Sequence, residues 1–205
     1  MKLYYAPGAC SIGIHVLLEE IGKPYQAEAV NLRDGAQFKP PFTGVNAKAK
    51  VPTLERDDGS ILTEFPVIAR WLARQNPQAN LIPKDEEADT RAMEAMEYIV
   101  GTIHSQGFTR IFRTDRFAPS QSDHDAVKAT GRENAEKGFS LIDKQLEGKP
   151  YLAGEFSIAD AALFYVEYWA AKRAAIQLPK NCAAHFDRMM SRPAVQRALQ
   201  QEAMS

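Results

Sequence analysis

Hydrophobic positions recur with two different spacings at the start of the chain. The short apolar run of residues 2–5, KLYY, predicts a strand. From Ser11 onward, apolar residues recur at helical spacing as far as Ile21, and Gly22 marks the end of that helix. This stretch therefore predicts a strand followed by a helix.

The pattern then continues as a mixture of strands and helices. Residues 25–32 predict a second strand, and a polar segment broken by glycine and proline follows it. Residues 51–63 predict a hairpin, with Asp58-Gly59 as its turn, and residues 66–75 predict a helix. The order β-α-β-loop-β-β-α places helices on a small mixed sheet, which is the layout of a thioredoxin-like fold.

The pattern of hydrophobic and polar residues changes around residues 76–86. Residues 76–86, NPQANLIPKDE, contain two prolines and no clear period, so they are typical of a linker. We therefore predict three parts, an α/β domain over 1–77, a linker over 78–86 and an all-helical domain over 87–205. The helices expected in the last part cover residues 87–113, 121–146, 157–175, 182–191 and 193–203.

Composition narrows the classes of function. The chain has 205 residues and a net charge of -1, so it lacks the basic excess of a nucleic-acid-binding protein. Cys10 and Cys182 lie too far apart for a disulfide framework or a zinc-like pair, so we expect reduced thiols, no metal and a cytoplasmic setting. No signal-peptide pattern and no apolar run of about 20 residues is present, so we expect no membrane association.

Cys10 is the first candidate for chemistry, because it stands where the first helix begins. A helix N-terminus favours an anion, so a thiol there is expected to have a lowered pKa and to be a better nucleophile. Ser11 can donate a hydrogen bond beside it or cap the helix. The alternative is a small buried cysteine next to an ordinary capping serine, and position alone leaves both interpretations open.

Three further positions have a functional and a structural interpretation. His104 lies near the apolar face of the long helix, where it is either a core-edge residue or a donor or base facing a cleft. Glu64 either caps the predicted helix over 66–75 or binds a ligand ammonium group. Val51 precedes Pro52; if this bond is cis, the Val51 backbone can pair with an extended peptide.

Two other motifs have mainly structural interpretations. In residues 107–117, GFTRIFRTDRF, the alternating aromatic and basic side chains favour a solvated helix face over a pocket for anionic, aromatic co-substrates. Ser157 and Asp160 form a variant capping box, whose expected role is folding.

Taken together, these motifs make the chain similar to a known family. The sequence resembles the cytosolic glutathione transferases, most closely the bacterial beta class, over essentially its whole length. The resemblance depends on four segments in order, MKLYYAPGACS, KVPTLERDDGSILTE, YLAGEFSIADAALF and RPAVQRALQQE.

The resemblance implies a homodimer that uses glutathione as co-substrate to conjugate small electrophiles. It implies a thioredoxin-like domain with the glutathione site, an all-helical domain, and an acceptor pocket between them. By resemblance, Cys10 is the active-site cysteine, which can also support thiol-disulfide exchange, and Ser11 and His104 assist catalysis. The glutathione-binding positions are Val51, Pro52, Glu64 and Phe65, and the acceptor-pocket positions are Phe108, Arg110, Phe112 and Trp169.

Several positions depart from the family pattern. Phe65 stands where many relatives have serine, so only its backbone N–H can replace a hydroxyl contact to glutathione. The segment LRDGAQ lacks the usual lysines, Ser105 follows the histidine in place of lysine, and CSIGIH lacks a proline. These changes keep open an alternative, a non-catalytic binding or scaffold protein with the same fold. Cys182 matches no family role, and we expect it to be structural.

Overall fold

A computed structural model describes residues 1–203, and they form two compact units. The first unit comprises Met1–Ile82 together with the segment that begins at Met190, and the second unit is Pro83–Met189. The sequence pattern instead predicts a linker over 78–86 and assigns everything from residue 87 to the helical domain. The difference arises because the C-terminal helix packs on the first helix of the chain.

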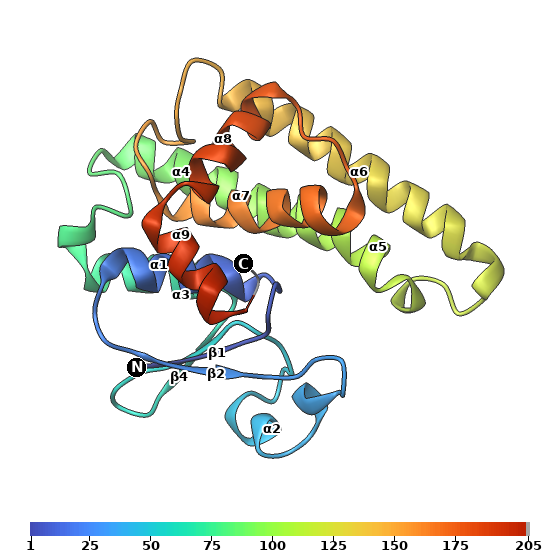
Figure 1. Ribbon diagram of the computed structural model, residues 1–205, viewed down its shortest axis with the longest axis horizontal. Coiled ribbons are helices and arrows are strands. Elements are labelled where there is room, and N and C mark those ends of the chain that lie inside the picture. Colours follow the sequence, from blue (N-terminus) through green and yellow to red (C-terminus); the bar gives the residue numbers. More distant parts are fainter. Residues whose placement is uncertain (204–205) are drawn as a thin grey trace. The chain divides into compact units, whose positions relative to one another are not determined.

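A four-stranded sheet forms the base of the first unit (Figure 1). Its strands are β1 (Lys2–Tyr5), β2 (Gln26–Ala29), β3 (Thr53–Glu55) and β4 (Ile61–Thr63), in the order β2-β1-β3-β4. β1 and β2 are parallel, whereas the β1–β3 and β3–β4 pairs are antiparallel. The mixed sheet and the 51–63 hairpin are therefore confirmed, although β2 is shorter than predicted.

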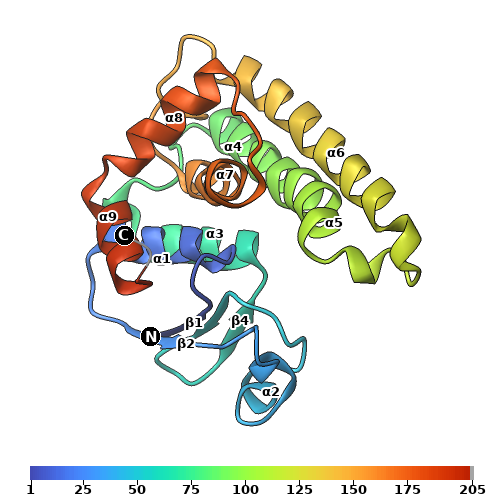
Figure 2. The same cartoon turned by 45° about the vertical axis from the view of Figure 1, so that its right-hand side comes forward.

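Helices cover both faces of this sheet. Figure 2 shows α1 (Ser11–Ile21) and α3 (Phe65–Gln75) on one face and the short α2 (Phe42–Val45) on the other. α1 ends as predicted, because Gly22 adopts a left-handed conformation with φ 70° and donates its N–H to the Leu18 carbonyl. The α/β layout expected from the sequence is thus confirmed.

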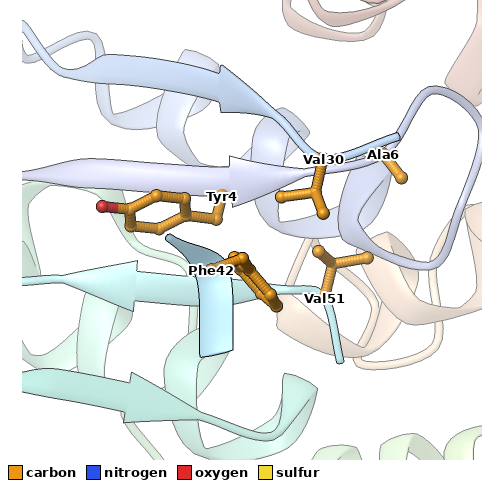
Figure 3. Packing of buried hydrophobic residues seen from close by; sticks show 5 residues of the cluster. All are labelled: Tyr4, Ala6, Val30, Phe42 and Val51. Carbon is orange, nitrogen blue, oxygen red and sulfur yellow. The ribbon is translucent and has the colours of Figure 1, made fainter. Parts of the chain in front are cut away.

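A small apolar cluster lies where β1 and β2 end and β3 begins (Figure 3). Tyr4 and Ala6 of the β1 segment, Val30 after β2, Phe42 of α2 and Val51 before β3 are all buried. The Tyr4 and Phe42 rings meet edge to face, with centroids 5.8 Å apart. This packing fixes Val51, because its side chain is anchored in the cluster.

The helix α9 (Pro193–Gln201) lies beside α1 in both ribbon views (Figures 1 and 2). The residue after it, Glu202, is buried and accepts hydrogen bonds from the Gly8 N–H at 2.8 Å and from His15 Nδ1 at 2.9 Å. Arg192 and Glu20 add an ion pair of 2.7 Å. These polar contacts explain why the C-terminal segment belongs to the first unit.

The second unit is all-helical and has a fully buried helix at its centre. Every residue of α7 (Ile158–Trp169) is buried, as its apolar sequence predicts. The expected helix over 87–113 is continuous, but its middle is a π-helix, η3. The helical segments of this unit are α4 (Glu86–Tyr98), η3 (Ile99–Phe108), α5 (Thr109–Phe112), α6 (His124–Gln145), α7, the π-helix η6 (Ala170–Ala174) and α8 (Lys180–Met190).

Two local features hold this unit together. The predicted capping box is confirmed, since Asp160 accepts from the Ser157 N–H at 2.8 Å while the Ser157 hydroxyl caps the start of α7. Gly138 of α6 allows close approach to η3: a Cβ added there would lie 2.4 Å from Ile103 Cγ1. α6 therefore packs directly along η3.

No helix among residues 1–203 is long and apolar enough to cross a membrane.

Candidate functional site

Cys10 is the N-cap residue of α1, and its thiol points to the segment before β3. Its Sγ donates to the Val51 carbonyl at 3.5 Å, so the structure joins two of the predicted site residues. Burial of the thiol raises its pKa to about 12, although the backbone N–H groups of Cys10 and Ser11 and the charge of Lys50 oppose this shift. The lowered pKa expected from the helix start is therefore wrong for the ligand-free protein.

Ser11 has a different role from the one expected. It is fully buried, its Oγ accepts from the Ala6 N–H at 3.2 Å, and its hydroxyl donates to the Ala6 carbonyl at 3.3 Å. The N-cap position belongs to Cys10, and no side-chain hydrogen bond caps α1. In this structure Ser11 closes the turn after β1; it neither caps the helix nor donates to the thiol.

The Val51–Pro52 peptide bond is cis, as the sequence suggested. Both residues are buried, and the chain enters β3 directly after them. The preceding loop is fixed by Asn46, whose side-chain amide donates to the Lys50 carbonyl at 2.9 Å and to Thr53 Oγ1 at 2.8 Å. A rigid backbone edge therefore stands opposite Cys10. A second cis bond, Pro40-Pro41, was not predicted.

Glu64 occupies the N-cap position of α3 with φ 71° and ψ 123°, a strained conformation for a residue other than glycine. Its carboxylate forms no capping hydrogen bond and instead accepts from Lys48 Nζ at 2.8 Å. The simple capping interpretation is therefore wrong. Phe65 follows as the first residue of α3, and it is buried.

Two lysines near this site were missed by the sequence analysis. Lys48 donates to both Glu64 and the Thr63 hydroxyl, and the charge of Lys50 acts on the Cys10 thiol. The available signal was the alternation of lysine and alanine just before Val51. This loop supplies two cations, although the segment after the second strand lacks lysines.

In the second unit, His104 lies on η3 against two aromatic residues of α7. Its Nδ1 is 3.2 Å from the Tyr165 hydroxyl, and its ring meets the Trp169 ring edge to face, with centroids 4.8 Å apart. His104 is partly buried, whereas Tyr165 and Trp169 are buried. The histidine is thus neither fully in the core nor on an open surface.

The predicted acceptor-pocket residues separate into two groups. Phe108, Phe112 and Trp169 form one aromatic cluster, with ring centroids 5.5 to 5.7 Å apart, and Phe112 is 38% exposed. Arg110 instead donates to Gln106 and lies 4.5 Å from the centroid of the Phe117 ring. The structure brings the aromatic residues together and places the Arg110 guanidinium with different partners.

This geometry defines a class of protein before any comparison. A thioredoxin-like unit with a cysteine at a helix start, opposite a cis-proline backbone edge, is typical of thiol-handling proteins. Residues 8–75 match the glutathione S-transferase N-terminal domain, and residues 125–197 match the glutathione S-transferase C-terminal domain. The chain belongs to the glutathione S-transferase family.

Individual relatives agree with this assignment. The chain is 36% identical over 208 residues to glutathione S-transferase GstA of Escherichia coli, covering 100% of both sequences. It is 32% identical, with a TM-score of 0.85 and 100% of both chains covered, to the bacterial beta class enzyme of Sphingomonas chungbukensis. A Sulfitobacter glutathione transferase homologue, solved with bound glutathione, is 29% identical with a TM-score of 0.89, over 100% of this chain and 98% of the other.

Proposed function

We propose that Cys10, Val51, Pro52, Glu64 and Phe65 form the glutathione site of this transferase. The protein is a glutathione transferase by family, and the Sulfitobacter homologue binds glutathione. The observation that carries the residue assignment is the convergence of α1, the loop before β3 and the start of α3. Cys10 Sγ contacts Val51, and the charge of Glu64 also acts on that thiol.

The chemistry of each group fits one part of glutathione. The Val51 backbone offers a peptide edge for the central cysteinyl residue, as extended peptides bind to strand edges. The Glu64 carboxylate suits the ammonium of the γ-glutamyl group, which would replace the Lys48 ammonium at that position. The start of α1 favours the bound thiolate, which then attacks a small electrophile.

In the helical unit, we assign His104 a catalytic role and the aromatic cluster a role in binding the electrophile. The aromatic cluster fits this binding role because Phe112 is exposed, while the buried rings of Phe108 and Trp169 pack against the Phe112 ring. The Arg110 guanidinium can leave its hydrogen bond to Gln106 and bind an anionic group of the substrate.

The wider assignments follow from the same family. We propose a homodimer, and the exposed Val67 on α3 is an apolar side chain suited to a subunit contact. We place the protein in the cytoplasm, which fits two cysteines that are both free thiols.

Glu64→Gln is expected to weaken binding of reduced glutathione about 10- to 100-fold, since it removes the charge from a charge-assisted hydrogen bond. Isothermal titration calorimetry with reduced glutathione measures the change directly. The fold should be unaffected, because the Glu64 side chain is half-exposed and forms no capping bond.

Glu28→Gln is the matched control. Glu28 also pairs with a lysine, Lys2, at 3.2 Å, and its side chain is 50% exposed against 52% for Glu64. It lies on β2, so binding should match that of the unchanged protein. If Glu64→Gln bound glutathione as tightly as the control, the γ-glutamyl group would have to be held by other residues.

Exchange through Cys10 is a second candidate activity, since its thiol contacts the backbone edge proposed for glutathione. The raised pKa of about 12 predicts that ligand-free Cys10 is alkylated slowly at neutral pH, with a rate that rises about tenfold per pH unit up to that pKa. Iodoacetamide labelling, followed site by site by mass spectrometry from pH 7 upward, measures this dependence.

Cys10→Ala controls for labelling elsewhere, because Cys182 is fully buried and should remain unlabelled in the folded protein. Rapid labelling of Cys10 at pH 7, with no further rise above it, would show a stabilised thiolate and contradict this expectation.

A further inference from the structure

Lys48 and Glu64 form an ion pair beside the start of α3, within the first unit. The Lys48 ammonium donates to Glu64 Oε1 at 2.8 Å and to Thr63 Oγ1 at 2.8 Å. The side chain of Lys48 is 55% exposed and that of Glu64 is 52% exposed, so a ligand from solvent can reach both charges. Exposed ion pairs of this kind add little to the stability of a fold, so stability does not explain this one.

The main chain holds both residues of this ion pair in place. The Lys48 N–H donates to Asn46 Oδ1 at 2.9 Å, and the Ala49 N–H donates to the Asn46 carbonyl at 3.0 Å. Glu64 has a φ of 71°, which is a costly conformation for a residue other than glycine. Its carboxylate forms no capping hydrogen bond with α3 that would offset this cost. Strain of this kind is concentrated at sites that bind ligands.

We propose that Lys48 and Glu64 together bind a zwitterionic α-amino-acid group, and that Lys48 is the residue that selects for its carboxylate. This inference rests on the glutathione site proposed above, and it assigns a residue that the site does not yet include. The γ-glutamyl group of glutathione carries an ammonium and a carboxylate on the same carbon atom. The ligand ammonium takes the place of Lys48 at Glu64, and the displaced Lys48 ammonium binds the ligand carboxylate.

The hydrogen-bonding capacity of lysine allows this change of partner. An ammonium has three N–H donors, and the Thr63 hydroxyl accepts from one donor of Lys48. The bond to Thr63 can therefore be kept while the donor released from Glu64 turns to the carboxylate. The neighbouring Phe65 has a buried apolar side chain, which supplies no donor of its own. Lys48 thus provides a positive charge next to the only group of the ligand that Glu64 would repel.

The test compares two ligands that differ only in the carboxylate. Reduced glutathione has this group, whereas γ-aminobutyryl-cysteinylglycine keeps the ammonium and lacks the carboxylate. In isothermal titration calorimetry, Lys48→Met should weaken binding of glutathione about 5- to 10-fold, the effect of a partly screened charge-assisted hydrogen bond. Binding of the decarboxylated ligand should weaken by less than about twofold, because Lys48 has no group to bind on it.

Lys2→Met is the matched control. Lys2 also donates to one glutamate and one hydroxyl, Glu28 at 3.2 Å and Tyr4 at 3.3 Å. It is the first residue of β1, whereas Cys10 follows the other end of that strand. Both ligands should therefore bind this variant as they bind the unchanged protein.

The outcomes separate the role of Lys48 from the glutathione site itself. Tighter or unchanged binding of glutathione in Lys48→Met would overturn the inference, because Lys48 would then only compete with the ligand for Glu64. An equal loss for both ligands would also overturn it, since the carboxylate would not be the group that Lys48 binds. In either case, weaker binding in Glu64→Gln would leave the proposed site intact. Unchanged binding of glutathione in both variants would overturn the site as well.

Discussion

Replacing His185 with phenylalanine should lower the free energy of unfolding by about 3–5 kcal/mol, as expected when one partner of a buried ion pair is removed. His185 of α8 is fully buried, with Nδ1 2.8 Å from Glu167 Oε2 and Nε2 3.3 Å from Asp160 Oδ1. The other oxygen of Glu167 is buried without a partner among the described residues. The substitution leaves the Glu167 carboxylate uncompensated. Urea unfolding measures the loss.

The double variant Glu167→Leu/His185→Phe distinguishes lost charge pairing from lost packing. Well-packed apolar side chains often replace a buried ion pair at no cost. The double variant should therefore recover most of the stability lost in the single variant. If it were as unstable as His185→Phe alone, packing of the imidazole and not its charge would be the stabilising factor.

The same pair should make stability depend on pH in a defined direction. Burial by itself would lower the pKa of His185, but Glu167 and Asp160 outweigh it and raise the pKa from 6.5 to about 9. The raised pKa of His185 means that its contribution is complete below pH 6.5 and is lost as pH rises through 9. Burial also raises the pKa of Glu167 from 4.5 to about 7, so its contribution is complete below pH 4.5 and is lost as pH rises through 7. The stability of the unchanged protein relative to the double variant should therefore fall as pH rises from 4.5 to 9.

Asp160→Ala should be comparably severe, with a loss of about 3–5 kcal/mol, because several buried groups lose one shared partner. The carboxylate accepts from the Leu152 N–H at 2.9 Å, from the Ser157 N–H at 2.8 Å and from the Ser157 hydroxyl at 2.9 Å. It also contacts His185, so this loss should not add to that of His185→Phe. Urea unfolding again provides the measurement.

Asp85→Ala is the comparison for this second prediction. Asp85 caps α4 and accepts from the Ala88 N–H at 2.9 Å, but the bond is exposed. Its loss should cost only about 1 kcal/mol, the usual value for an exposed cap. Equal losses in the two variants would show that Asp160 acts only as a helix cap and that its buried contacts add nothing.

The parts of this fold that depend on local sequence could be predicted. The end of α1 at Gly22, the turn at Asp58-Gly59 and the capping box at Ser157 each depend on residues within a few positions of one another. The C-terminal segment could not be placed, because its position depends on Glu202 reaching His15, 187 residues earlier in the chain. Sequence spacing carries no information about such a contact.

The candidate site likewise has features that could be predicted from the sequence and features that could not. The positions of Cys10, Val51 and Glu64 were predictable from motifs, and Cys10 and Val51 are in contact. The pKa of Cys10 could not be predicted from motifs, because the helix start lowers this pKa while burial raises it. Only the three-dimensional packing decides which effect is larger. Likewise, the Ser11 hydroxyl could not be known to bind Ala6 before the turn was seen.

The divided first unit also has a consequence for the order in which the protein is made. Residues 83–189 form the helical unit as one continuous stretch, whereas the thioredoxin-like unit needs both residues 1–82 and the segment from Met190 onward. During synthesis from the N-terminus, the helical unit can therefore be complete while His15 still lacks Glu202. We therefore expect the unit that is translated first to finish folding last.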